Sequence, residues 1–166
     1  MRSSDTAAAA RISGEAGARF ADIDEPRIAA CAADEPFTAD ELDAYVVVGR
    51  AWVATEDGEV VGFVIVDVLD GAPHIEEIDV APDASNRGHG TRLLAAVIDW
   101  ATNRRAPAVT LTTFRDVPWN LPWYERHGFR TLADDEITPE LAARRAAEDA
   151  DGLPADLRVA MRLPLV

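Results

Sequence analysis

Lysine is absent from this chain, and all 16 of its basic residues are arginine. Chemistry that forms a Schiff base on a lysine of this chain is therefore excluded. A single cysteine, Cys31, excludes an internal disulfide. No segment approaches the ~18 consecutive apolar residues of a membrane span. Residues 1–10 also lack the charged start and apolar centre of a secretory signal, so we expect a cytoplasmic protein with no membrane partner.

Positive charge is also scarce relative to negative charge. Thirty acidic residues give a formal net charge of −14, whereas binding to a nucleic-acid backbone needs a basic surface. We therefore expect no nucleic-acid partner. The acidity favours cationic substrates such as amines, although an acidic surface also serves solubility. With 166 residues, 48% of them hydrophobic, the chain predicts one domain over residues 1–166.

Strands and helices are mixed along the chain. Thr38 and Glu41 form a capping box, and Asp57-Gly58 is a strong hairpin turn. An antiparallel meander, one β-α-β crossover and further strands predict an α/β fold: a mixed, mostly antiparallel twisted sheet with helices on both faces. The expected helices are 7–20, 39–48, 90–104, 118–126 and one that opens with Thr138 as its cap; the expected strands are 52–55, 60–69, 74–80, 108–114, 129–132 and 157–163.

The segment from Val80 to Leu94 reads as the end of a strand, a glycine turn and the start of an amphipathic helix. Gly88 and Gly90 remove side chains where the backbone can approach a ligand. The free N–H groups and positive end of the helix would then bind phosphate, with Arg87 beside them. The segment is no P-loop, because Gly-Lys-Ser/Thr is missing, and the third Rossmann glycine would fall on Leu93. The alternative is a turn that is only structural.

Two further groups of residues could carry chemistry. Tyr124, on the expected helix 118–126, could donate a proton as a general acid, or it could simply pack. Alternation along the strand 74–80 places Glu76 on one face and Glu77 on the other. Either carboxylate could deprotonate an amine; we prefer Glu76, and the alternative is that both face solvent or an arginine. No Cys/His cluster has metal-ligand spacing, so we expect no metal.

Taken together, two motifs resemble the GNAT superfamily of N-acetyltransferases. The first is Val80 followed by Arg87-Gly-His-Gly90 and a helix, and the second is Trp123-Tyr-Glu-Arg-His-Gly-Phe129. One helix and one strand separate them, as in that family. The resemblance extends from about Trp52 to Leu132. The segment from Ile137 to Leu163 resembles an uncharacterised bacterial branch.

The resemblance implies a GNAT fold and an acetyl-CoA site. Main-chain atoms of the strand would pair with the pantetheine arm, and the turn would hold the pyrophosphate. Tyr124 would protonate the departing CoA thiolate. Asn120 would have an altered cofactor role, and Ser85 and Asn86 depart from the family pattern at one phosphate contact. The implied cofactor residues are Ile78, Asp79, Val80, Arg87, Gly88, His89, Gly90, Thr91 and Asn120.

The activity implied is direct transfer of acetyl from acetyl-CoA to a primary amine, which would be a small cationic amine or a protein amine. The alternative is a non-catalytic acyl-CoA-binding or regulatory module of the same fold. The family's first strand would be short or absent, because Met1 to Ala10 is a poor strand. An exposed sheet edge left in its place, or the last strand, could pair two copies into a homodimer.

Overall fold

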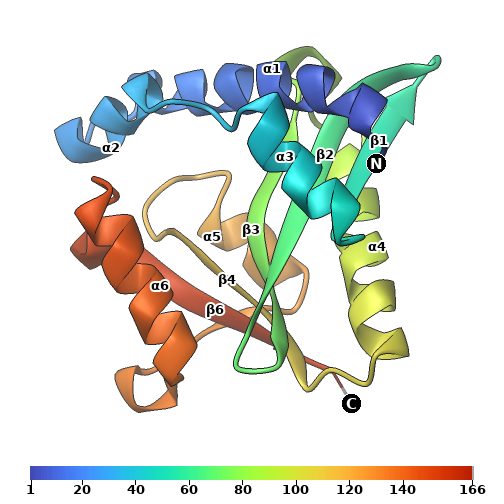
Figure 1. The fold of residues 1–166 in the computed structure, drawn as a ribbon. Coiled ribbons are helices and arrows are strands. Elements are labelled where there is room, and N and C mark those ends of the chain that lie inside the picture. Colours follow the sequence, from blue (N-terminus) through green and yellow to red (C-terminus); the bar gives the residue numbers. More distant parts are fainter. Residues whose placement is uncertain (166) are drawn as a thin grey trace. The chain divides into compact units, whose positions relative to one another are not determined.

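The computed structural model describes residues 1–165, and these contain six strands and six α-helices (Figure 1). The strand order is β1-β2-β3-β4-β6-β5. Pairs β1–β2, β4–β6 and β5–β6 are antiparallel, and β3–β4 is parallel, which confirms the mixed, mostly antiparallel sheet. The elements are β1 (Ala51–Glu56), β2 (Glu59–Leu69), β3 (Ala72–Val80), β4 (Ala108–Phe114), β5 (Arg130–Thr131), β6 (Arg158–Pro164), α1 (Thr6–Gly17), α2 (Pro26–Ala30), α3 (Ala39–Val47), α4 (His89–Asn103), α5 (Leu121–Arg126) and α6 (Pro139–Ala150).

The chain packs as two compact units that share strands β2 and β3. The first unit holds Met1–Asp67 and Glu76–Trp100, and the second holds Val68–Ile75 and the chain from Ala101 onward. The expectation of one domain over the whole chain stays a prediction. No helix within residues 1–165 is long and apolar enough to cross a membrane.

The core of the first unit lies between its N-terminal helices and the β1–β2 hairpin. Ile12 of α1 and Leu42 of α3 are fully buried with Phe63 and Ile65 of β2. Apolar residues at helical spacing predict α1, but its α-helix ends at Gly17 and a 3₁₀ segment continues to Asp22. The predicted helix 7–20 is therefore helical throughout, with a tighter final turn.

The predicted capping box opens α3. The Thr38 hydroxyl accepts the N–H of Glu41 at 3.3 Å, and the Glu41 carboxylate accepts the N–H of Thr38 at 2.8 Å. These bonds from the backbone and hydroxyl of Thr38 lower the pKa of Glu41. A reciprocal pair of this kind satisfies donors that the helix itself leaves free, so the local sequence suffices to start α3.

The Asp57-Gly58 turn has the geometry that its sequence predicts. Both residues have positive φ, 51° and 89°, as a two-residue hairpin turn requires when its twist matches the strands. Glu56 and Glu59 are paired across it. Within residues 1–165 no strand precedes β1, which lies at one end of the strand order.

In the second unit, β4 and β6 pair along their whole lengths, from Ala108 with Pro164 to Phe114 with Arg158. The sequence prediction for β4 matches its observed bounds. At its N-terminal half β3 pairs with β4 through His74–Thr110 and Ile75–Leu111. Buried His74 also contacts Thr110 through its ring, with 2.9 Å between Nδ1 and Oγ1.

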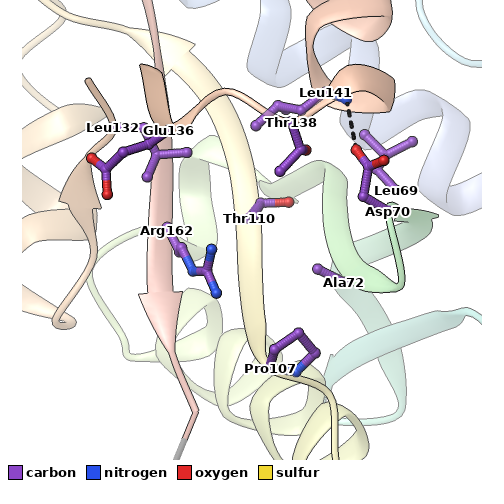
Figure 2. A pocket seen from close by; sticks show the side chains of 10 residues that line it. All are labelled: Leu69, Asp70, Ala72, Pro107, Thr110, Leu132, Glu136, Thr138, Leu141 and Arg162. Atoms are coloured by element: carbon purple, nitrogen blue, oxygen red, sulfur yellow. Dashed lines mark hydrogen bonds between the residues drawn. The ribbon is translucent and has the colours of Figure 1, made fainter. Parts of the chain in front are cut away.

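The start of α6 corrects one prediction. Thr138 occupies the N-cap position, but its side chain makes no capping bond to the helix. Asp70, in the β2–β3 turn, accepts the N–H groups of Glu140 at 2.9 Å and Leu141 at 3.4 Å, and Figure 2 shows the bond to Leu141. The Thr138 hydroxyl bonds to the same carboxylate, and the Glu140 carboxylate accepts the N–H of Asp70. The cap therefore comes from a residue about 70 positions away.

This cap borders a small cavity of about 60 Å³ within the second unit. Figure 2 shows its lining, which is mixed apolar and polar. The acid Glu136 at its rim is bound by Arg130 at 2.8 and 2.6 Å, and these bonds lower its pKa to about 2. The lining residues are Leu69, Asp70, Ala72, Pro107, Thr110, Leu132, Glu136, Thr138, Leu141 and Arg162.

We predict that Asp70→Asn lowers the thermal midpoint and that Asp70→Ala lowers it further. Asn keeps an acceptor and tolerates the φ of +49° at this position, whereas Ala does neither. Bonds from Thr138 and the backbone lower the pKa of Asp70 in the folded chain. The advantage of the wild type over Asp70→Asn should therefore be present at neutral pH and disappear as pH falls through that lowered pKa. Calorimetric melts at several pH values measure this, and a pH-independent difference would contradict it.

Candidate functional site

The turn between β3 and α4 is built from backbone that only certain residues adopt readily. After Val80 a short 3₁₀ segment, Pro82–Ala84, leads to Asn86 with φ of +61° and Gly88 with φ of +82°. A Cβ on Gly88 would meet nothing within 4 Å. Gly88 is therefore needed for its conformation and not because neighbours crowd it, and the space beside it is open.

Helix α4 begins directly after Gly88, one residue earlier than predicted. Its inner face is buried through Leu93, Leu94 and Val97, as its spacing predicts. The first N–H groups of a helix have no acceptor within it and carry its positive dipole end. His89, Gly90 and Thr91 are the residues of this first turn, and they directly follow the open position of Gly88.

Arg87 is held at the turn by two acceptors. Its Nη1 donates to Glu56 at 2.9 Å, and its Nη2 donates to the carbonyl of Asp83 at 2.8 Å. Just over half of its side chain, 55%, is exposed. Arg87 therefore lies at the entrance of the turn, as the sequence suggests, but its charge is paired with Glu56, a residue that the sequence analysis missed.

His89 has a structural role that the sequence analysis also missed. Its side chain is 2% exposed, and its Nδ1 lies 2.6 Å from Nη2 of Arg92. Its Nε2 has no hydrogen-bond partner within residues 1–165 and lies 3.7 Å from the Glu56 carboxylate. The β1–β2 hairpin therefore places the carboxylate of Glu56 next to the first residue of α4.

Gly62 brings strands β2 and β3 close together beside this turn. A Cβ at this position would lie 2.8 Å from the backbone oxygen of Asp79 and 3.2 Å from Val80. No Cβ tolerates the first distance, so only glycine fits here. The N–H of Ala81 also donates to Val61 at 2.9 Å. The end of β3 is thus fixed against β2 just before the chain turns.

The acids of β3 form a hydrogen-bonded pair. Glu77 and Asp79 are two residues apart and therefore share a face, and their side chains are bonded to one another. Oδ2 of Asp79 is shielded from solvent and has no partner within residues 1–165. Burial raises the pKa of Asp79 well above its ordinary value, the charge of Glu77 and the shared bond raise it further, and Arg19 opposes them. The pair therefore retains a proton at a pH where an exposed aspartate has lost its own.

The remaining predicted strand residues, Glu76, Ile78 and Val80, are half-buried on β3 within the first unit. The structure thus brings the glycine turn and the five residues of β3 from Glu76 to Val80 into one unit. No group of three or more His, Cys, Asp or Glu side chains among residues 1–165 is placed to hold a metal ion.

Asn120 and Tyr124 lie in the second unit. The expected helix start at Pro118 is wrong, because α5 begins at Leu121, after Asn120 with φ and ψ both −97°. The backbone oxygen of Asn120 accepts the N–H of Trp123 at 2.9 Å and of Tyr124 at 3.2 Å. Its side chain makes no capping bond.

Tyr124 is buried between aromatic neighbours, with 9% of its surface exposed. Its ring meets Trp123 edge to face at 4.9 Å between centroids and Phe129 at 5.7 Å. Its carbonyl accepts the N–H groups of His127 and Phe129 at 2.9 and 3.1 Å. The ring of Tyr124 therefore packs in the core, and a role of its hydroxyl as a general acid stays a prediction.

The mixed sheet, the glycine turn and the long helix α4 that follows it are the elements that the two sequence motifs imply. The model of the acetyltransferase (GNAT) family matches residues 18–129. The chain therefore belongs to the GNAT family, as the two sequence motifs indicate.

Similar proteins include a mycothiol acetyltransferase of Nocardiopsis dassonvillei, which is 31% identical in an alignment that covers 57% of this chain and 36% of that protein. The chain spans about a third of the length of the curated relatives it matches. The PaiA N-acetyltransferase of Thermoplasma acidophilum in complex with coenzyme A superposes with a TM-score of 0.73 at 13% identity, over 99% of this chain and 96% of that chain. The ribosomal-protein-S18-alanine N-acetyltransferase of Escherichia coli gives 0.66 at 18% identity, over 99% and 90%. These two structural matches show the fold.

We predict that Asp79→Asn makes stability less dependent on pH. In the folded wild type Asp79 keeps its proton above the ordinary pKa of 3.8, so wild-type stability falls as pH rises from there through the raised pKa. Asn resembles the protonated acid and has no such loss. Its stability relative to wild type should therefore increase across this window in denaturant titrations at a series of pH values.

Glu77→Gln is the matched control for this prediction. It removes the charge that helps to raise the pKa of Asp79, so in this variant the decline in stability with rising pH should end at a lower pH and be smaller than in the wild type. Parallel curves for the wild type and Asp79→Asn would show that Asp79 does not retain its proton.

Proposed function

We propose that this chain transfers an acetyl group from acetyl-CoA to a primary amine by direct attack. The observation that carries the proposal is the open turn at Gly88, which precedes a 15-residue helix in a chain of the GNAT family. Such a helix start offers backbone donors and a positive dipole end to phosphate groups. Membership of the GNAT family indicates that the ligand bearing these phosphates is acetyl-CoA, the acyl donor.

The cofactor would lie along the turn and the end of β3. We propose that the backbone N–H groups of Gly88, His89, Gly90 and Thr91 hold the pyrophosphate, with Arg87 at the entrance. Main-chain groups of Ile78, Asp79 and Val80 would pair with the pantetheine arm. The fixed end of β3 beside Gly62 supports this role, because a rigid strand presents its backbone in one position.

The transfer needs a proton acceptor and a proton donor. The amine nitrogen would attack the thioester carbonyl and form the amide bond, while the bond from carbon to sulfur breaks. We propose Glu76 or Glu77 as the acceptor of the amine proton, directly or through water, and the Tyr124 hydroxyl as the donor to the CoA thiolate.

The acceptor would be a small cationic amine or a protein amine. A net charge of −14 and the acids of β3 support a cationic acceptor, since clefts of one sign concentrate ligands of the other. The fold is also that of the ribosomal-protein-S18-alanine N-acetyltransferase, whose name gives a protein as its substrate, so a protein amine is the second case. A cytoplasmic location, a homodimer and the cofactor role of Asn120 stay predictions.

A non-catalytic acyl-CoA-binding module of the same fold is the alternative function. Ser85 and Asn86, where the family pattern differs, favour it because one phosphate contact could be lost. Such a module would bind acetyl-CoA without releasing CoA in the presence of any amine. Thiol release measured over a panel of amines separates the two functions.

We predict that Gly88→Glu weakens acetyl-CoA binding roughly a hundredfold or more, because a carboxylate would face the phosphates at close range. Gly88→Ala is the matched control: it carries the same strain at φ of +82° without the charge. That strain, about 1–2 kcal/mol, is present in both the free and the bound protein, so the affinity should fall by less than about tenfold. Isothermal titration of both variants, with melts to establish folding, tests the site. Equal affinities of the two variants for acetyl-CoA would show that its phosphates do not bind at this turn.

We predict that Tyr124→Phe lowers kcat about a hundredfold while the Kd for acetyl-CoA changes little. Phe keeps the ring that packs against Trp123 and Phe129, so only the hydroxyl is lost. Steady-state kinetics with the best amine of the panel measures kcat, and titration measures Kd. An unchanged kcat would exclude Tyr124 as the acid, and parallel losses in both quantities would indicate a structural role.

A further inference from the structure

Four side chains form a charged cluster at the base of the glycine turn, which we call the Glu56 cluster: Glu56, Arg87, His89 and Arg92. All four lie in the first unit. Glu56 ends β1 at the hairpin turn, and the other three belong to the turn before α4 and its first residues. The hairpin therefore places one carboxylate among three potential donors.

The tautomer of His89 follows from its neighbour. A guanidinium can only donate, so Nδ1 of His89, 2.6 Å from Nη2 of Arg92, must be the acceptor. The ring proton then lies on Nε2. This Nε2–H is buried and has no partner within residues 1–165, which is an unfavourable state for a donor.

The acceptor that His89 lacks is already near it. Oε2 of Glu56 lies 3.7 Å from Nε2, which is too far for a hydrogen bond. The same oxygen accepts from Nη1 of Arg87 at 2.9 Å. Arg87 is 55% exposed and Glu56 36%, and exposed ion pairs of this kind contribute little to stability. Arg87 can therefore leave Glu56 at small cost.

We propose that Glu56 is a positioning residue that exchanges partners when acetyl-CoA binds: Arg87 turns from Glu56 to the pyrophosphate, and Glu56 accepts the Nε2 proton of His89 in its place. This inference rests on the proposed function, because it assumes that Arg87 meets the pyrophosphate. No covalent bond changes. The exchange leaves neither the carboxylate nor the buried imidazole without a partner, and the hairpin stays joined to α4 throughout.

The exchange predicts opposite effects for the two partners of the bond that forms. Glu56→Gln removes the competitor for Arg87 and a negative charge near the phosphates, and its amide oxygen can still accept from His89. It should bind acetyl-CoA about two- to fivefold tighter. His89→Phe leaves Glu56 without its second partner and should bind about fivefold weaker. His89→Gln, which restores a donor near Nε2, should recover part of this loss.

Isothermal titration with acetyl-CoA of the wild type, Glu56→Gln, His89→Phe and the double variant tests the proposal. In the double variant the loss caused by His89→Phe should shrink, because the neutral amide of Glu56→Gln forms a weaker bond to His89 than the carboxylate does. Glu59→Gln is the matched control. Glu59 pairs with Glu56 across the hairpin, so Glu59→Gln removes the same charge at the same end of the hairpin. This variant should leave the Kd for acetyl-CoA unchanged.

A second acyl donor, S-acetylpantetheine, lacks the pyrophosphate. It distinguishes an effect of Glu56 on pyrophosphate binding from a general effect on the structure. The KM for this donor should be the same in wild type and Glu56→Gln. If Glu56→Gln binds acetyl-CoA as wild type does while Arg87→Ala binds more weakly, the partner exchange is overturned and the cofactor site stands. If the wild type does not bind acetyl-CoA, the proposed function and this inference both fall.

Discussion

The constraint on which the candidate site depends is the reversal of the chain after β3 through two residues in the left-handed region, Asn86 and Gly88. This conformation leaves open space beside Gly88, directly before α4, and leaves Arg87 exposed with His89 buried. It also accounts for the choice of residues, since glycine and asparagine tolerate positive φ better than other residues. The fixed end of β3, held against Gly62, and the buried inner face of α4 hold the turn from both sides.

Charge at this turn is arranged by pairing and not by an excess of one sign. A chain of net charge −14 would repel an anionic cofactor at long range, so a phosphate site needs local donors that the surrounding acids do not cancel. Backbone N–H groups serve this purpose because no side chain competes for them through a charge. Glu56 holds the guanidinium of Arg87 in place, and the acids of β3 limit their own repulsion by sharing a proton.

Local sequence predicted those elements whose causes are local. The Asp57-Gly58 hairpin, the Thr38–Glu41 capping box, strand β4 and the turn before α4 all follow from neighbouring residues. The errors share a different cause. Thr138 does not cap α6 because Asp70 reaches it from a distant turn, and Arg87 and His89 meet Glu56 only because a hairpin about 30 residues earlier ends beside them. No spacing rule identifies partners that tertiary structure brings together.

Calorimetric titration of the unmodified chain with acetyl-CoA, in parallel with CoA, ATP and NAD, tests the central claim most directly. A pyrophosphate site that belongs to a GNAT acetyltransferase predicts micromolar binding of acetyl-CoA and CoA, with no comparable binding of ATP or NAD. Absence of binding for both CoA compounds would mean that the glycine turn only reverses the chain. Equal binding of all four ligands would mean that the turn recognises phosphate without selecting the acyl donor, and either result would contradict an acetyl-CoA site.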